Sequence, residues 1–220
     1  SNDDLLPLGP ALADLPLVTA GSGVAIGLPA NFGLAASSTA SALPPARGLR
    51  AVVSGSCSQA TLRQVQALQA TGRPAFVIDP LRLAQGHDVV GEALAWAGER
   101  LADGPVLLYS SAEPAAVQAV QGQLGVAAAG ERVEQALAAV ARGLVALGVR
   151  QLVVAGGETS GACVQALGVR QMRIGTQIDP GVPWCHAQAP GTGAEGLHLA
   201  LKSGNFGGDD FFTRAFALLA

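Results

Sequence analysis

The sequence predicts an α/β fold in which a mostly parallel sheet carries helices on both faces, as in a Rossmann-like three-layer sandwich. Two observations predict it. Short apolar runs typical of strands buried on both faces alternate with stretches typical of helices. In addition, several of the apolar runs end in a turn rich in Gly, Ser and Thr. The carboxyl ends of parallel strands meet at one edge, where such sheets bind ligands.

Composition limits the classes of protein that fit. The chain has 220 residues, half of them hydrophobic, and a net charge of −3. It can therefore bury a sizeable core. Mean hydropathy is +0.38, but no run of about 18 apolar residues is free of charges or of Gly and Pro, so we expect no membrane span. The start of the chain lacks the pattern of a signal peptide. Without a basic block, nucleic acid is not an expected partner.

The cysteines and histidines carry no catalytic pattern. Three cysteines, Cys57, Cys163 and Cys185, form no CxxC pair, and their odd number indicates free thiols in a reducing compartment, by default the cytoplasm. Metal binding by Cys185 and its neighbour His186 would lack a second ligand pair. No Ser/His/Asp arrangement can be argued from the histidines, so none receives a catalytic role.

The first part of the chain predicts one strand–turn–helix unit. Residues 15–19 are apolar enough for a strand, which would enter the turn Ala20-Gly21-Ser22-Gly23. We expect short helices over residues 3–13 and 24–28 around this strand. A loop rich in Ala, Ser and Pro would follow over residues 29–47.

The middle of the chain repeats the alternation of strand and helix. Strands are predicted over residues 49–53, 74–78, 105–109 and 151–155. The helices between them are predicted over residues 59–70 and 88–101, from Glu113-Pro114 onward, and over residues 131–147, where Gly148 would end the last one. The turns after Thr19, Val53, Tyr109 and Ala155 should then share one edge of the sheet.

The turn after Ala155 is the centre of the predicted site. Gly156 and Gly157 precede Glu158, Thr159, Ser160 and Gly161, and a helix is expected over residues 162–167. Glycines allow close approach to the main chain, and a helix N-terminus attracts anions. One interpretation is thus a phosphate site. The other is a tight connection in which Thr159 or Ser160 caps the helix.

The last third departs from this pattern. Residues 171–178 and 196–202 alternate apolar with polar positions, which predicts an additional pair of strands with one exposed face. A stiff, turn-rich segment over residues 179–184 separates them. A closing helix is expected over residues 211–219, capped by Asp209 and Asp210.

A second glycine-rich segment contains the only lysine of the chain. Lys202 begins the sequence KSGNFGG, which comes before the closing helix. A lysine can act as a point charge on a phosphate, and glycine-rich turns expose N–H groups to anions. The Walker spacing is absent. The alternative interpretation is a glycine-rich turn with a solvated lysine.

With these motifs in view, the chain resembles the C-terminal domain of the four-carbon acid sugar kinases, a family that includes 3-oxo-tetronate, threonate and erythronate kinases. The matching pieces follow the family's order and cover nearly the whole chain: LVTAGSG from Leu17, VSGSCS from Val53, AGGETSG from Ala155, DPGVPW from Asp179 and LKSGNFGG from Leu201. Ala20 departs from the family's TGGSG, and its side chain would keep a ligand farther from the main chain than a glycine would.

The resemblance implies that residues 1–220 form one nucleotide-binding domain and that the family's N-terminal sugar-acid-binding domain is absent from this chain. It implies contacts of the nucleotide with three segments. We also expect Lys202 to contact the phosphates. The expected binding residues are then Ser56, Ser58, Gly156, Gly157, Glu158, Thr159, Lys202, Ser203, Gly204, Asn205 and Gly207. Glu158 either orients Mg²⁺ through water or caps the helix.

The sequence therefore predicts the ATP-binding half of a kinase that phosphorylates a hydroxyl of a four-carbon sugar acid, with ATP and Mg²⁺ as cofactors. The general base would belong to the absent domain, so this chain alone should bind ATP or ADP with negligible turnover. One alternative is a non-catalytic module that binds a nucleotide or sugar phosphate. An oxidoreductase or transferase using a dinucleotide lacks its GxGxxG signature. The oligomeric state is left open, with a homodimer as one option.

Overall fold

The computed structural model describes residues 2–35, 37, 39–110, 126–191 and 196–219. The chain divides into two compact units, Ser1–Ala40 and Ser41–Ala220. The second unit contains the predicted sheet. Among the described residues, no helix is both long and apolar enough to cross a bilayer.

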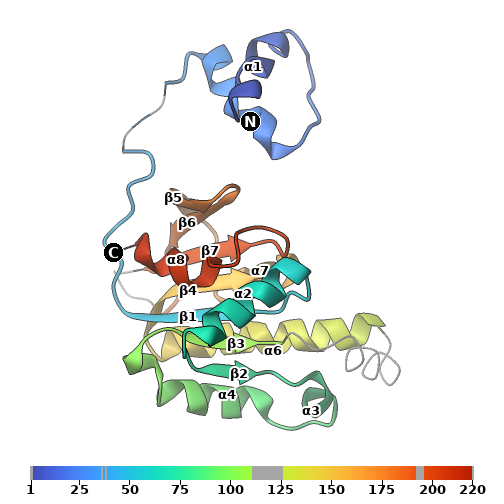
Figure 1. Ribbon diagram of the computed structural model, residues 1–220, viewed down its shortest axis with the longest axis vertical. Helices are drawn as coiled ribbons and strands as arrows, with labels where there is room; N and C mark the ends of the chain where they lie inside the picture. The colour runs from blue at the N-terminus through green and yellow to red at the C-terminus, as the bar shows by residue number, and fades with distance from the viewer. Residues whose placement is uncertain (1, 36, 38, 111–125, 192–195, 220) are drawn as a thin grey trace. The chain divides into compact units, whose positions relative to one another are not determined.

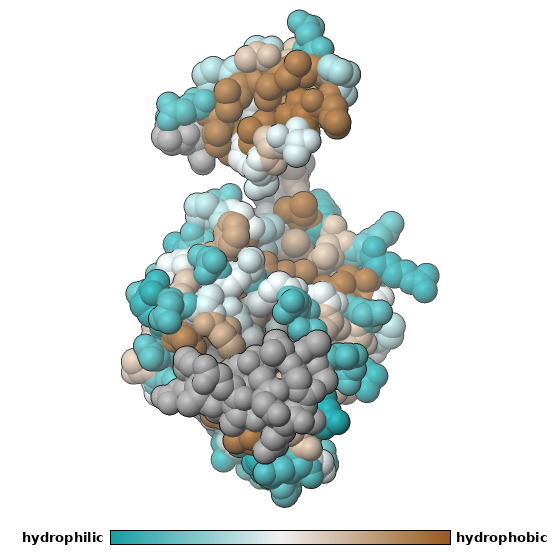
Figure 2. All heavy atoms as spheres, turned by 90° about the vertical axis from the view of Figure 1, so that its right-hand side faces the viewer, coloured by the Kyte–Doolittle hydropathy of each residue, from teal (hydrophilic) through white to brown (hydrophobic). Residues whose placement is uncertain are grey.

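The first unit consists of short helical turns. They are η1 (Asn2–Asp4), α1 (Leu8–Ala11), η2 (Ser22–Ile26) and η3 (Leu28–Phe32). The strand predicted over residues 15–19 is wrong, because these residues pair with no neighbouring strand and Leu17 is 81% exposed. The turn after Thr19 consequently follows no strand, and the helix predicted over residues 3–13 is reduced to η1 and α1. Apolar side chains gather on the surface of this unit (Figure 2).

The second unit is built on a mixed sheet, drawn in Figure 1. Its strand order is β2-β3-β1-β4-β7-β6-β5. The strands are β1 (Leu49–Ser54), β2 (Ala75–Val77), β3 (Val106–Tyr109), β4 (Val149–Ala155), β5 (Met172–Asp179), β6 (Val182–Ala187) and β7 (Leu197–Lys202). The five strands from β2 to β7 in this order are parallel, and β6 is antiparallel to both β7 and β5. The predicted mostly parallel sheet is confirmed.

Helices cover both faces of this sheet. On one face of the sheet, Val52, Val153 and Ala200 form an apolar cluster with residues of α2 (Gln59–Ala70) and α8 (Phe211–Ala217). Val53, Val154 and their neighbours pack on the opposite face. The elements there are α3 (Pro80–Ala84), α4 (Val89–Gly98), η4 (Leu101–Asp103), α6 (Val126–Ala146) and α7 (Gly157–Ala166). This is the predicted three-layer arrangement.

The described residues of the last third form three strands rather than the predicted two. β6 occupies part of the segment predicted as turn-rich, because Trp184 is fully buried and its indole N–H donates to the carbonyl of Ala215 at 2.8 Å. The exposed face predicted for residues 196–202 is wrong, since β7 lies between β4 and β6 and is almost entirely buried. The exposed strand is β5, at the edge of the sheet.

The helix bounds differ from prediction in a few places. α2 begins and ends where predicted, and Gly148, with a φ of +101°, follows α6 as expected. α6 begins earlier than predicted and α3 adds a short helix after Asp79. The helix expected from Glu113-Pro114 lies outside the described residues.

Candidate site at the carboxyl edge of the sheet

Three turns meet at the carboxyl ends of three adjacent strands. We call them the β1 turn (residues 55–58), the β4 turn (residues 156–159) and the β7 loop (residues 203–208). The Gly55 N–H donates to the carbonyl of Ala155 at 3.0 Å, and the Gly156 N–H donates to the carbonyl of Lys202 at 2.8 Å. Segments distant in the sequence thus lie side by side. Of the turns predicted to share one edge, those after Val53 and Ala155 do lie together, and the β7 loop joins them.

The glycines of the turns are required by how closely the turns approach. A Cβ at Gly55 would lie 2.2 Å from the Thr159 hydroxyl, and one at Gly204 would lie 2.6 Å from the Ser56 hydroxyl. Gly156 also has a φ of +123°, which L side chains rarely adopt. In contrast, a Cβ at Gly157 would meet nothing within 4 Å. Gly157 therefore faces open space.

Ser58 and Thr61 bind the β7 loop to the start of α2. Ser58 is the N-cap of α2, because its hydroxyl accepts the N–H of Thr61 at 3.2 Å. The same hydroxyl donates to the carbonyl of Gly204 at 2.6 Å, and the buried Thr61 hydroxyl donates to this carbonyl at 2.8 Å. Thr61 was not among the predicted site residues.

Lys202 is fully buried beneath the β7 loop. Its ammonium donates to the Thr61 hydroxyl at 2.9 Å and to the carbonyls of Ser203 and Gly204, both at 3.0 Å. Burial lowers the pKa of Lys202 to about 8. The alternative of a solvated lysine is wrong, because these three acceptors are supplied from inside the protein. In this structure Lys202 holds the loop, and direct contact with a phosphate would require it to leave these acceptors.

The β4 turn leads directly into α7. Helix α7 begins at Gly157 with Gly156 as its N-cap and no side-chain cap, and its first backbone bond runs from the Ser160 N–H to the Gly156 carbonyl at 2.8 Å. Capping by Thr159 or Ser160 is therefore wrong, since both lie inside the first turn. The N–H groups of this turn have no acceptor within the helix.

Glu158 projects from the first turn of α7 and is exposed. Its carboxyl group is close to Glu134 of α6: burial, followed by the charge of Glu158 and a hydrogen bond with it, raises the pKa of Glu134. The described residues contain no cluster of three or more His, Cys, Asp or Glu that could hold a metal ion by itself. Carboxylate oxygens are nevertheless present beside the β4 turn.

The remaining predicted residues lie on the β7 loop. Ser203 and Asn205 are exposed, and Gly207, with a φ of +83°, lies so near Phe211 that a Cβ would be 2.6 Å from its ring. Gln64, like Thr61, was not predicted as a site residue. The sequence signal that could have identified both is their spacing, because Ser58, Thr61 and Gln64 recur every three residues and share one side of α2.

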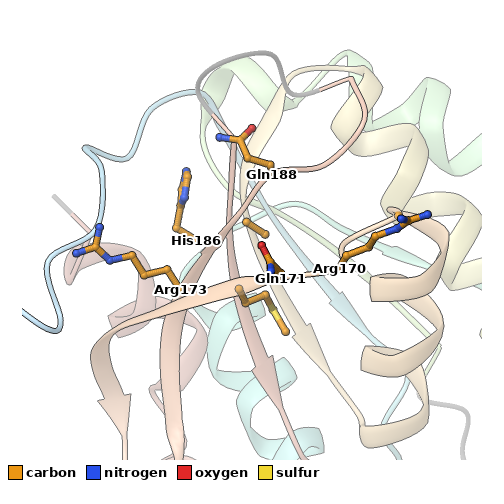
Figure 3. A pocket seen from close by; sticks show the side chains of 8 residues that line it. Arg170, Gln171, Arg173, His186 and Gln188 are labelled. Atoms are coloured by element: carbon orange, nitrogen blue, oxygen red, sulfur yellow. The ribbon is translucent and has the colours of Figure 1, made fainter.

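A pocket of about 700 Å³ lies elsewhere, beside the start of β7, where Ala187 pairs with Leu197. It is lined by Gly168, Arg170, Gln171, Met172, Arg173, His186, Ala187 and Gln188. Figure 3 shows the side chains of Arg170 and Arg173 extending away to opposite sides. None of the predicted site residues lines this pocket, and its two cations do not converge.

The sequence from residue 51 to residue 212 matches the model of a family described as the nucleotide-binding C-terminal domain. The chain belongs to this family. A 3-oxo-tetronate kinase of Burkholderia multivorans is 57% identical over the whole of this chain, which covers 51% of that protein. The chain therefore spans about half the length of such curated relatives.

Solved structures agree with the fold. A Haemophilus influenzae protein superposes with a TM-score of 0.78 at 35% identity, and the match covers 100% of this chain and 52% of that one. A Bordetella bronchiseptica protein, described as a domain-swapped dimer with bound citrate, superposes with a TM-score of 0.59 at 27% identity, covering 100% and 50%.

Proposed function

We propose that this chain is the ATP-binding half of a kinase that phosphorylates a four-carbon sugar acid of the 3-oxo-tetronate, threonate or erythronate type. The observation that carries the proposal is the convergence of the β1 turn, the β4 turn and the β7 loop at one edge of the sheet. The name of the relative that is 57% identical supports the reaction class.

The topology favours a ligand at this edge. Helix α2 leaves β1 toward one face of the sheet, whereas α7 leaves β4 toward the other. β1 and β4 are neighbours, so their helices diverge at a topological switch point, where doubly wound sheets bind nucleotides. The predicted residues of the β1 and β4 turns lie on the two sides of this point.

The backbone can supply the donors that phosphates need. Among the described residues, the N–H groups of Gly204, Asn205 and Gly207 find no acceptor, and those in the first turn of α7 have none within the helix. In our proposal these two sets of amides bind the phosphates of ATP or ADP. Lys202 contributes its charge from beneath the β7 loop.

Mg²⁺ fits the residues beside the β4 turn. Magnesium takes one or two carboxylates together with phosphate oxygens and water, and Glu158 offers an exposed carboxylate at this place. Bound there, the ion would neutralise charge on the phosphates during transfer. We assign Glu158 to this role, and Glu134 lies beside it on α6.

The proposal treats residues 1–220 as one nucleotide-binding domain and places the sugar-acid site and the general base in the other half of the protein. Phosphoryl transfer depends on positioning both substrates. This chain alone should then bind nucleotide and turn over negligibly. Dimerisation is also proposed, on the precedent of the Bordetella bronchiseptica protein.

Isothermal titration calorimetry of the chain with ADP, with and without Mg²⁺, tests the nucleotide site. We expect saturable binding that strengthens with Mg²⁺. No binding at millimolar ADP would overturn the proposal. A full-length protein assayed for ADP release with a panel of four-carbon acids tests the reaction, and binding without any turnover there would favour a non-catalytic nucleotide-binding module.

A further inference from the structure

Gln64 makes an unusual set of contacts with the β7 loop. Its side chain is fully buried on α2, and its amide nitrogen lies 3.0 Å from the carbonyl oxygen of Phe206, 2.9 Å from that of Gly207 and 3.0 Å from that of Gly208. A glutamine amide has only two N–H donors. Three consecutive carbonyls therefore share one donor group, and all three face α2.

The direction of each carbonyl determines the direction of the next amide. In a trans peptide the C=O of one residue and the N–H of the following residue lie in one plane and point in opposite directions. Lys202 holds the carbonyls of Ser203 and Gly204. These bonds turn the N–H groups of Gly204 and Asn205 away from the interior.

Gln64 completes this pattern. The carbonyl of Phe206 shares its peptide plane with the N–H of Gly207, and the carbonyl of Gly207 shares its plane with the N–H of Gly208. The amides without an acceptor among the described residues, those of Gly204, Asn205 and Gly207, each follow a carbonyl that Lys202 or Gln64 holds.

The remaining amide of the series already binds an anion. The Gly208 N–H donates to a carboxylate oxygen of Asp179 at 3.2 Å, and Asp179 also pairs with Arg214. Its peptide partner, the carbonyl of Gly207, is held by Gln64. An amide that Gln64 orients thus faces an anionic oxygen in this protein.

We propose that Gln64 is a positioning residue for phosphate recognition. It touches no phosphate itself, and it acts by holding carbonyls inward so that the Gly207 N–H points at the phosphate chain. This inference rests on the proposed nucleotide site. A purely structural role would make Gln64 important for stability but not selectively for phosphate.

The test compares Gln64→Met with Gln66→Met. Methionine keeps much of the length of glutamine but has no donor, and Gln66 is an exposed glutamine on the same helix. For Gln64→Met we expect the Kd for ADP to rise about tenfold or more, the effect of one charge-assisted hydrogen bond. We expect the Kd for adenosine to stay within about twofold of wild type. Gln66→Met should bind both ligands as wild type does.

Amide spectra provide the readout that a structural role would not move. In ¹H–¹⁵N spectra of the wild-type chain, ADP should shift the signals of Gly204, Asn205 and Gly207. In Gln64→Met the Gly207 shift on ADP addition should be lost, while the signals of β1 and β4 keep their wild-type positions. An unchanged ADP affinity, or an equal loss of ADP and adenosine affinity, would overturn the positioning role.

The failure of this inference is separable from the failure of the proposed function. If the wild-type chain binds no ADP, the nucleotide site itself is refuted. If the wild type binds ADP and Gln64→Met binds it equally well, the site stands and the role of Gln64 is refuted.

Gln64→Glu gives a further check, because its carboxylate cannot donate to the carbonyls until it is protonated. Its ADP affinity should move toward that of wild type as pH falls, and a constant difference from wild type would contradict the donor role.

Discussion

The hydroxyl of Ser58 donates to the carbonyl of Gly204 at 2.6 Å across 146 residues of sequence. Ser58 is the N-cap of α2, just after β1, and Gly204 lies just beyond β7. This bond therefore joins the carboxyl ends of β1 and β7, which are the first and the last of the parallel strands along the chain. The bond cannot form unless β1, β4 and β7 are aligned. The geometry of the candidate site therefore depends on the completed sheet.

Thr61→Val should weaken both the fold and the site. Valine keeps the shape of threonine but removes the hydroxyl that donates to Gly204 and accepts from Lys202. Leaving a buried ammonium short of one acceptor costs about 1–3 kcal/mol. We expect the free energy of unfolding, measured by urea denaturation, to fall by this amount, and the Kd for ADP to rise.

The matched control is Thr176→Val, on the exposed face of the edge strand β5. Surface changes of this kind alter stability by no more than about 0.5 kcal/mol. Equal stability losses in the two variants would show that Thr61 has no special part in holding the β7 loop.

Gly157→Ala separates ligand approach from folding. A Cβ at Gly157 meets nothing within 4 Å, so the variant should fold as stably as wild type. If phosphates approach the first turn of α7, the added methyl group stands in their path, and the Kd for ADP should rise about tenfold. Calorimetry of the folded variant measures this.

Gly161→Ala serves as its control. Gly161 lies on the same helix, also with no atom within 4 Å of an added Cβ, but one turn beyond the helix start. Alanine stabilises a helix interior by about 1 kcal/mol relative to glycine. The melting temperature should rise and ADP affinity should stay unchanged. An ADP affinity of Gly157→Ala equal to that of Gly161→Ala would exclude phosphate contact at the β4 turn.

The parts of the fold that the sequence predicted are those with strong local signals. Helix α2 has a serine cap and an apolar stripe, and it was predicted with its observed bounds. The parallel strands were predictable because runs of Val, Leu and Ala need cover on both faces. Residues 15–19 are equally apolar, yet they form no strand, since a strand also needs a pairing neighbour that local sequence does not reveal.

The site was predictable in position but not in detail. Glycine and hydroxyl residues after three strands indicated where a ligand would lie. The burial of Lys202 could not be predicted, because one of its acceptors belongs to Thr61, 141 residues away, and the others are carbonyls whose direction depends on the loop. The same dependence on backbone direction concealed Gln64.

Cys57 offers a chemical probe of the β1 turn. Its thiol is exposed between Ser56 and Ser58, whereas Cys163 and Cys185 are buried. Burial raises the pKa of Cys163 to about 12 and also raises that of Cys185, so neither should react near neutral pH. Mass spectrometry after iodoacetamide treatment should show one modified cysteine in the native chain, at position 57.

ADP should slow this alkylation if the nucleotide covers the β1 turn. The reaction of the unfolded chain in urea provides the control, since all three thiols react there with or without ADP. An alkylation rate of native Cys57 that ADP leaves unchanged would place the nucleotide away from Ser56 and Ser58.

The lowered pKa of Lys202 predicts opposite pH trends for binding and stability. Its pKa is about 8 in the folded chain, against the ordinary lysine value of 10.5. Between these values the unfolded chain binds more protons, so the contribution of Lys202 to the free energy of unfolding rises as pH increases from about 8 to about 10. Over the same range the ammonium beneath the β7 loop loses its charge, and ADP affinity should fall. The second pKa of a phosphate is about 6, so the ligand's own charge stays constant over this range.

Lys202→Met is the control, because it has no titrating group at this position and should lack both trends. If the ADP affinity of wild type and of Lys202→Met changed with pH in the same way, the charge of Lys202 would have no role in binding.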